Sequence, residues 1–143
     1  MAVPSRRFHL PIRIAIVGRA KMAGGDVDGA LALFNTALEA ASNTGERWYE
    51  PELLRLKAEV LLTQPEPHAR EAEYCLKAAI ALAQEQEAKF WELRAATMLA
   101  VLWKQQGHRA EAHSLLAPVC NWFSEGSGTA DVKDANALLA ELA

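Results

Sequence analysis

The residues best suited to chemistry are a few acidic and histidine side chains that stand close together in the chain. The segment Asp26-Val27-Asp28-Gly29 opens like a calcium-binding loop, but a third ligand and the closing glutamate of such loops are missing. His108 and His113 flank Glu111, yet residues five apart do not share a helix face, and the H-E-x-x-H zinc pattern is absent. We therefore expect no metal site, and we interpret Asp26 as part of a turn between two helices.

Other kinds of site are also incomplete. The segment Gly126-Ser127-Gly128-Thr129 is glycine-rich, but no strand precedes it as in phosphate-binding loops. The serines and threonines have no partner that could act as a base for nucleophilic catalysis. A tryptophan cage is an alternative, but Trp48, Trp91 and Trp103 fall on the side where helices pack, which favours core filling. We predict no catalytic residue, no cofactor and no enzyme activity.

The composition indicates one soluble, helical domain. Of 143 residues, 51% are apolar and 23% are charged, and alanine and leucine outnumber β-branched residues, which favours helix. The net charge of −3 argues against general nucleic-acid binding. No apolar run reaches transmembrane length, so no membrane partner is expected. Cys75 and Cys120 stand inside expected helices, and we predict buried, reduced thiols in a cytoplasmic protein.

The basic residues are unevenly distributed along the chain. Residues 1–25 contain no acidic residue but five basic ones, namely Arg6, Arg7, Arg13, Arg19 and Lys21. This segment is either a solvated helix face that follows a loose terminus, or a docking patch for an acidic partner.

A helical hairpin occurs three times along the chain. Its clearest copy runs from Lys89 to Leu116, where two amphipathic helices are joined at Gln106-Gly107-His108. One hairpin cannot bury its apolar face alone, whereas three stacked hairpins form a continuous core. After an extended lead over residues 1–11, we predict hairpins over residues 12–42, 46–87 and 89–124, with helices at Ile12–Met22, Val27–Ala41, Arg47–Thr63 and about His68–Gln86 in the first two. A last helix over 130–142 is expected to cover Trp122 and Phe123.

The run G-R-A-K-M-A-G-G-D-V-D-G-A-L-A-L-F-N-T-A-L-E, residues 18–39, resembles a tetratricopeptide (TPR) repeat. That family places a small residue in the first helix and an alanine, an aromatic residue and an alanine in the second, which are here Gly18, Ala30, Phe34 and Ala37. The small residues Gly18, Ala58 and Ala100 are 40 and 42 residues apart, more than the roughly 34 typical of the family. The resemblance implies an all-α fold in a single domain over residues 12–143: an α-solenoid of three TPR-like hairpins plus a C-terminal capping helix, about seven helices in all.

Three segments carry a narrower resemblance. They are G-E-R-W-Y-E-P-E-L-L-R-L-K (45–57), F-W-E-L-R-A-A-T-M-L-A-V-L-W (90–103) and L-L-A-P-V-C-N-W-F-S-E-G-S-G-T-A-D-V-K-D-A (115–135). They are similar to the C-terminal TPR region of bacterial signalling proteins that join an adenylate cyclase or winged-helix module to an AAA or STAND-type ATPase. The chain contains no G-x-x-x-x-G-K-[ST] loop and no cyclase domain, so no such activity is inferred for it. The resemblance implies the tail, or a stand-alone remnant, of such a protein.

In TPR domains the first helices line a concave groove that binds peptide segments. Transferred by register, the resemblance implies that the groove residues are Arg19, Glu52, Arg55, Glu59, Arg94, Thr97, Lys104 and Gln105. It thus implies a non-catalytic, regulatory module with a protein or peptide partner. Two alternatives stay open. In the first, these charged side chains only face solvent and bind no partner. In the second, the chain is a self-association module that uses the uncovered N-terminal end of the stack, namely Ile12, Ile14, Ile16 and Val17.

Overall fold

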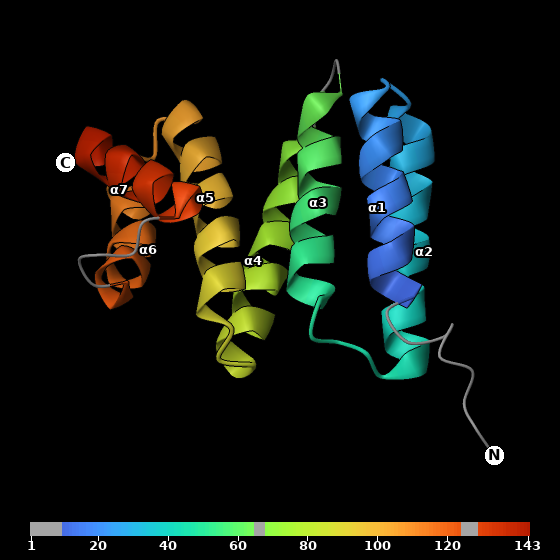
Figure 1. The fold of residues 1–143 in the computed structure, drawn as a ribbon. Helices are drawn as coiled ribbons and strands as arrows, with labels where there is room; N and C mark the ends of the chain where they lie inside the picture. The colour runs from blue at the N-terminus through green and yellow to red at the C-terminus, as the bar shows by residue number, and fades with distance from the viewer. Residues whose placement is uncertain (1–9, 65–67, 124–128) are drawn as a thin grey trace.

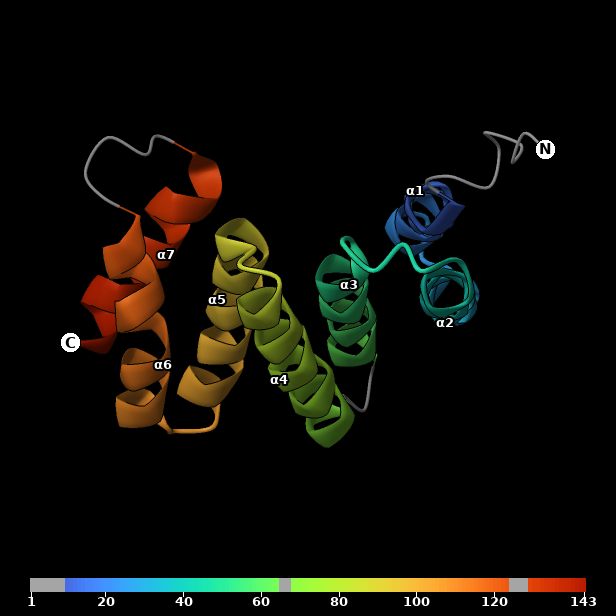
Figure 2. The same ribbon diagram turned by 90° about the horizontal axis from the view of Figure 1, so that it is seen from below.

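The computed structural model describes residues 10–64, 68–123 and 129–143, which form seven α-helices and no strand (Figure 1). The all-α prediction is confirmed. Consecutive helices pack against each other along the chain, and Figure 2 shows α1, α3 and α5 in one layer and α2, α4 and α6 in the other. The helices are α1 (Leu10–Ala23), α2 (Val27–Thr44), α3 (Glu50–Thr63), α4 (Ala69–Glu85), α5 (Lys89–Gln105), α6 (Arg109–Trp122) and α7 (Ala130–Leu142).

Short polar and glycine residues set the helix ends. The Asp26 carboxylate accepts a hydrogen bond from the backbone N–H of Gly29 at 2.9 Å and caps the start of α2. Gly45 ends α2 with a φ of 77°, a left-handed conformation that glycine adopts without strain. The Thr129 hydroxyl accepts from the N–H of Val132 and caps α7. The predicted turn role of Asp26 is confirmed.

Several helix ends differ from the prediction. Helix α1 begins at Leu10 rather than Ile12, because Pro11 lies in the first helical turn, where its missing N–H would have no helical partner. The rest of the predicted lead lies outside the described residues. Helix α2 continues to Thr44, where the loop was expected from Ser42. Helix α3 begins at Glu50 rather than Arg47, because Pro51 has no N–H to donate to the Arg47 carbonyl four residues earlier.

The core consists of two apolar clusters that share α3. On one side of α3, Leu53, Leu56 and Val60 pack with α1 and α2, and on the other side Ala58 and Leu61 pack with the later helices. Because one helix contributes to both clusters, α3 holds the first hairpin to the rest of the molecule.

Small residues stand where helices approach closely. A Cβ atom added at Gly18 of α1 would lie 2.8 Å from Cε1 of Phe34 in α2, so the two helices pack at a distance that excludes a side chain there. Ala58 and Ala100, at the corresponding places in α3 and α5, are fully buried. The small residues that the family resemblance places in the first helices are thus buried in the core.

The expectation that Trp48, Trp91 and Trp103 fill the core is wrong for Trp48, and the other two are partly buried. Trp48 is 49% exposed because it lies in the turn before α3. Trp122 is 59% exposed, so the expectation that α7 covers this side chain is wrong. The Trp122 ring packs edge-on against partly buried Phe123 instead. Helix α7 packs on α5 and α6, where it buries its own apolar face, namely Val132, Ala135, Leu138 and Leu142.

Candidate interaction groove

A groove follows the face of α5 that points away from α6. Helical periodicity brings Arg94, Thr97, Met98, Val101 and Gln105 onto one stripe over three turns. Thr97 satisfies its own hydroxyl by donating to the Leu93 carbonyl at 2.7 Å, which leaves its methyl group to the groove wall.

Two adjoining cavities form the groove. The first has a volume of about 300 Å³ and lies between α3, α5 and α7, and the second has about 370 Å³ and extends towards the start of α4. Both share Met98 and Val101, which form an apolar floor, and Val101 is 39% exposed. The name α5 groove is used below for these cavities, lined by Arg55, Leu62, Ala69, Arg94, Thr97, Met98, Val101, Leu102, Gln105, Gln106, Asp131 and Asp134.

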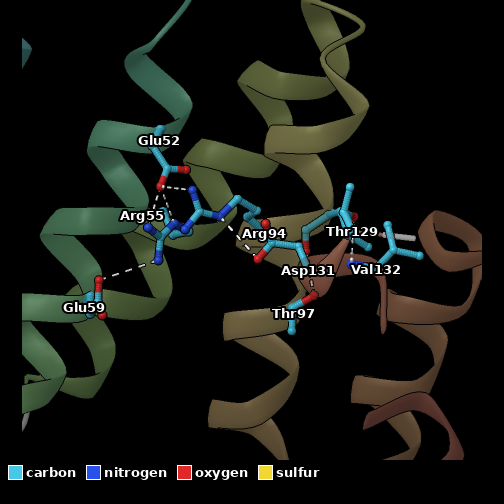
Figure 3. Close-up of polar contacts among 9 residues, drawn as sticks. Glu52, Arg55, Glu59, Arg94, Thr97, Thr129, Asp131 and Val132 are labelled. Atoms are coloured by element: carbon cyan, nitrogen blue, oxygen red, sulfur yellow. Dashed lines mark hydrogen bonds and ion pairs between the residues drawn. The ribbon is translucent and has the colours of Figure 1, made fainter. Parts of the chain in front are cut away.

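A chain of alternating charges crosses one end of the groove (Figure 3). The Glu52 carboxylate of α3 accepts from Nε of Arg55 at 2.7 Å and pairs with Nη1 of Arg94, on α5, at 2.9 Å. Arg55 also pairs with Glu59 at 3.6 Å, and Arg94 reaches Asp131 of α7 at 3.7 Å. The network therefore links three helices that are far apart in the sequence.

The centre of this network is buried. Glu52 is 1% exposed and Arg55 is 6% exposed. Burial alone would lower the pKa of Arg55, but the hydrogen bond to Glu52 and the charge of Glu59 outweigh it, and the pKa is raised. Removing one partner from such a buried pair leaves an uncompensated charge, which costs about 3–5 kcal/mol. Glu52 is thus a structural residue, and its Oε2 atom accepts no hydrogen bond from any residue that the structure describes.

Tyr49 lies beside the network. Its ring packs edge-on against Trp91 with 5.5 Å between centroids. Burial raises the pKa of Tyr49, and the negative charge of Glu52 raises it further. The phenol is therefore neutral, and Arg19 of α1 is close enough to act on it electrostatically.

The predicted groove residues occupy three kinds of place. Arg55, Arg94, Thr97 and Gln105 line the α5 groove. Glu52 and Glu59 do not line it but hold its arginines. Lys104 pairs with Glu141 of α7, and Arg19 lies exposed on α1 outside the lining residues.

Eight lining residues were not predicted, namely Leu62, Ala69, Met98, Val101, Leu102, Gln106, Asp131 and Asp134. Met98 and Val101 continue the α5 stripe of Arg94 and Thr97 at i, i+3 and i+4 spacing, so a closer reading of helical periodicity would have found them. Asp131 and Asp134 come from α7, and nothing in their local sequence indicates which face of the stack that helix covers.

The other candidate sites have plain structural surroundings. Lys21 lies 3.4 Å from Asp26, and the Gly29 N–H lowers the pKa of that carboxyl most strongly. Within residues 10–64, 68–123 and 129–143, no three His, Cys, Asp or Glu side chains are grouped as a metal site would require. No helix in that part of the chain is both long and apolar enough to cross a membrane. Cys75 and Cys120 are free and buried, as predicted, and burial raises the pKa of both thiols.

Comparison with protein-family models, with curated proteins and with solved structures finds no match to this chain.

Proposed function

We propose that this chain is a non-catalytic protein-interaction module that binds a segment of a partner protein in the α5 groove. The observation that carries the proposal is the open apolar floor of Met98 and Val101 between charges that are held in place by other residues. An apolar floor supplies free energy of binding when it is covered, and charges at the rim orient the bound segment.

The repeated hairpin supports this function. We infer three TPR-like units, because small, fully buried residues recur at corresponding places in each hairpin. These places are Ala30, Ala72 and Ala112 in the second helices, and Gly18, Ala58 and Ala100 in the first. Stacked helical hairpins form extended concave surfaces, and such surfaces suit the binding of protein segments. From the sequence resemblance we further infer a regulatory role beside or within a cytoplasmic bacterial signalling ATPase or cyclase.

A matched pair of valines tests the proposal. Val101 is 39% exposed in the groove, and Val17 is 50% exposed on α1 outside it. A displayed random-peptide library is selected against the wild-type chain, and affinities are measured by calorimetry. We expect Val101→Asp to weaken the selected peptides at least about tenfold, which corresponds to about 1.4 kcal/mol, and Val17→Asp to leave them unchanged. No enrichment, or an equal loss in both variants, would contradict the proposed function.

A second candidate function is self-association. Ile16 of α1 is 62% exposed and Val17 is 50% exposed, which leaves neighbouring branched aliphatic side chains uncovered at one end of the molecule. Static light scattering at increasing concentration tests it, and a mass that stays at one chain would contradict it.

A further inference from the structure

The outer face of α1 is both apolar and basic. Ile16 and Val17 are exposed there, and Arg13 lies one turn before Val17 on the same face. The helix Leu10–Ala23 contains three basic residues and no acidic one. A surface of this kind fits a partner that offers an apolar floor beside negative charge.

The α5 groove has that composition. Four carboxylates, from Glu52, Glu59, Asp131 and Asp134, stand in or beside it against only two guanidinium groups, from Arg55 and Arg94. Both arginines are already engaged by Glu52, and Asp134 forms no ion pair with any residue that the structure describes. The rim of the groove therefore carries excess negative charge next to the exposed side chain of Val101.

Symmetric pairing of two α1 helices is disfavoured. It would bring the Arg13 guanidinium group of one copy close to that of the other, and α1 contains no carboxylate to offset the repulsion. Helix α1 also lies at one end of the molecule, whereas the groove lies between α3, α5 and α7, with α3 between the groove and α1 (Figure 1). One copy therefore cannot satisfy both surfaces by itself.

We propose that the outer face of α1 of one copy docks in the α5 groove of a second copy, so that chains associate head to tail. This inference rests on the proposed function of the groove and names its occupant. Ile16 and Val17 cover Met98 and Val101, and Arg13 of α1 faces Asp134 and Asp131. Because the contact joins two different surfaces, an open assembly always retains one free α1 face and one free groove, and it grows until the chain of copies closes or dilution stops it. Association weakens with added salt, because the Debye length falls to about 3 Å at about 1 M.

Two variants, each with one of the two surfaces disrupted, distinguish head-to-tail association from other modes of association. Val17→Asp damages α1 and leaves the groove intact, and Val101→Asp damages the groove and leaves α1 intact. Sedimentation velocity is run on each variant alone and on an equimolar mixture, after circular dichroism has established unchanged helicity. We expect the dissociation constant for self-association of each variant alone to be at least about tenfold higher than that of the wild type. The mixture should form a heterodimer that grows no further, since one intact surface remains on each partner.

Tyr74→Asp is the matched control, because Tyr74 is 76% exposed on α4 and belongs to neither surface. It should associate like the wild type. A wild-type chain that stays monomeric, a mixture that fails to pair, or a loss of association in Tyr74→Asp overturns the proposal. If the wild type is monomeric but selected peptides still bind in a Val101-dependent manner, the head-to-tail contact is refuted and the proposed function of the groove stands.

Discussion

The two ends of this molecule are built differently. At the C-terminal end, α7 crosses the last hairpin, buries Leu138 and Leu142, and is tied down by contacts of Glu141 with Lys104 and Arg109 (Figure 1). At the N-terminal end, α1 packs mainly against α2 and leaves Ile16 and Val17 in solvent. Each end is built on a pair of packed helices, α1 with α2 and α5 with α6, and the added helix α7 makes the difference between a closed end and an open one.

The difference extends to charge. At the open end all the charged residues of α1 are basic, whereas at the closed end α7 brings Asp131 and Asp134 to the groove. Closing one end with an acidic helix therefore also creates a surface complementary to the other end. A helix that caps a stack can in this way determine what the stack binds.

The largest effect is expected at Glu52, which connects the closed end to the middle of the molecule. Glu52→Gln leaves the guanidinium groups of Arg55 and Arg94 without their shared carboxylate and should lower the free energy of unfolding by about 3–5 kcal/mol. Urea denaturation of the variant and the wild type measures this loss of unfolding free energy. Glu59 is a partner of the same Arg55, but its side chain is 38% exposed, so Glu59→Gln should cost at most about 1 kcal/mol. Equal losses in the two variants would show that the burial of Glu52 is not what matters.

Truncating one aliphatic side chain at each end compares the ends directly. Leu138→Ala in α7 removes a side chain that is only 9% exposed and should cost about 2–4 kcal/mol. Ile16→Ala in α1 removes one that is 62% exposed and should change the free energy of unfolding by less than about 0.5 kcal/mol. Denaturation is measured on dilute protein, so that association does not contribute. Similar losses at both positions would contradict the contrast between a closed and an open end.

The inner face of α1 should respond quite differently from its outer face. Gly18→Ala places a methyl group against the Phe34 ring and should cost about 1–3 kcal/mol. Gly24→Ala is the control, because its nearest neighbours, at 3.6 Å, are at ordinary contact distance. Thermal denaturation of the two variants checks this, and a neutral Gly18→Ala would mean that α1 and α2 are not as closely packed as the structure shows.

The smallest effect concerns pH at the closed end. The hydrogen bond from Lys104 lowers the pKa of Glu141 below its ordinary value. A lowered pKa stabilises the folded state fully above the ordinary glutamate value of about 4.3, and this contribution is lost as the pH falls through the lowered value. The melting temperature of the wild type should therefore exceed that of Glu141→Gln at neutral pH, and the gap should close in acid. A gap that does not change with pH would contradict the role of this pair.

The helices could be predicted because their determinants are local. Apolar periodicity, the cap at Asp26 and the glycine turns each act within a few residues, and six of the seven helices end within about two residues of the expected place. The observed helices and burial differ from the predicted ones at Pro51, which delays the start of α3, and at Trp48, which lies exposed in a turn.

The groove could be predicted only in part. Of the groove residues that the family resemblance implied on α5, Arg94, Thr97 and Gln105 line the observed cavities, because all three lie on one helix face. The burial of Glu52 depends on the approach of Arg94 from another hairpin, and the contribution of Asp131 depends on how α7 folds back. In the sequence both look like ordinary surface acids, since tertiary packing alone distinguishes them.

The methionines allow the most direct test of the claim that the α5 groove is the binding surface. Met98 lies in the groove floor and Met22 lies on α1, and the third methionine, Met1, can be assigned by substitution. Methyl-labelled methionine NMR is recorded while a selected peptide is added. We predict that the Met98 signal shifts in proportion to occupancy and that the Met22 signal stays in place. A peptide that binds without moving the Met98 signal would contradict the assignment of the α5 groove as the interaction surface.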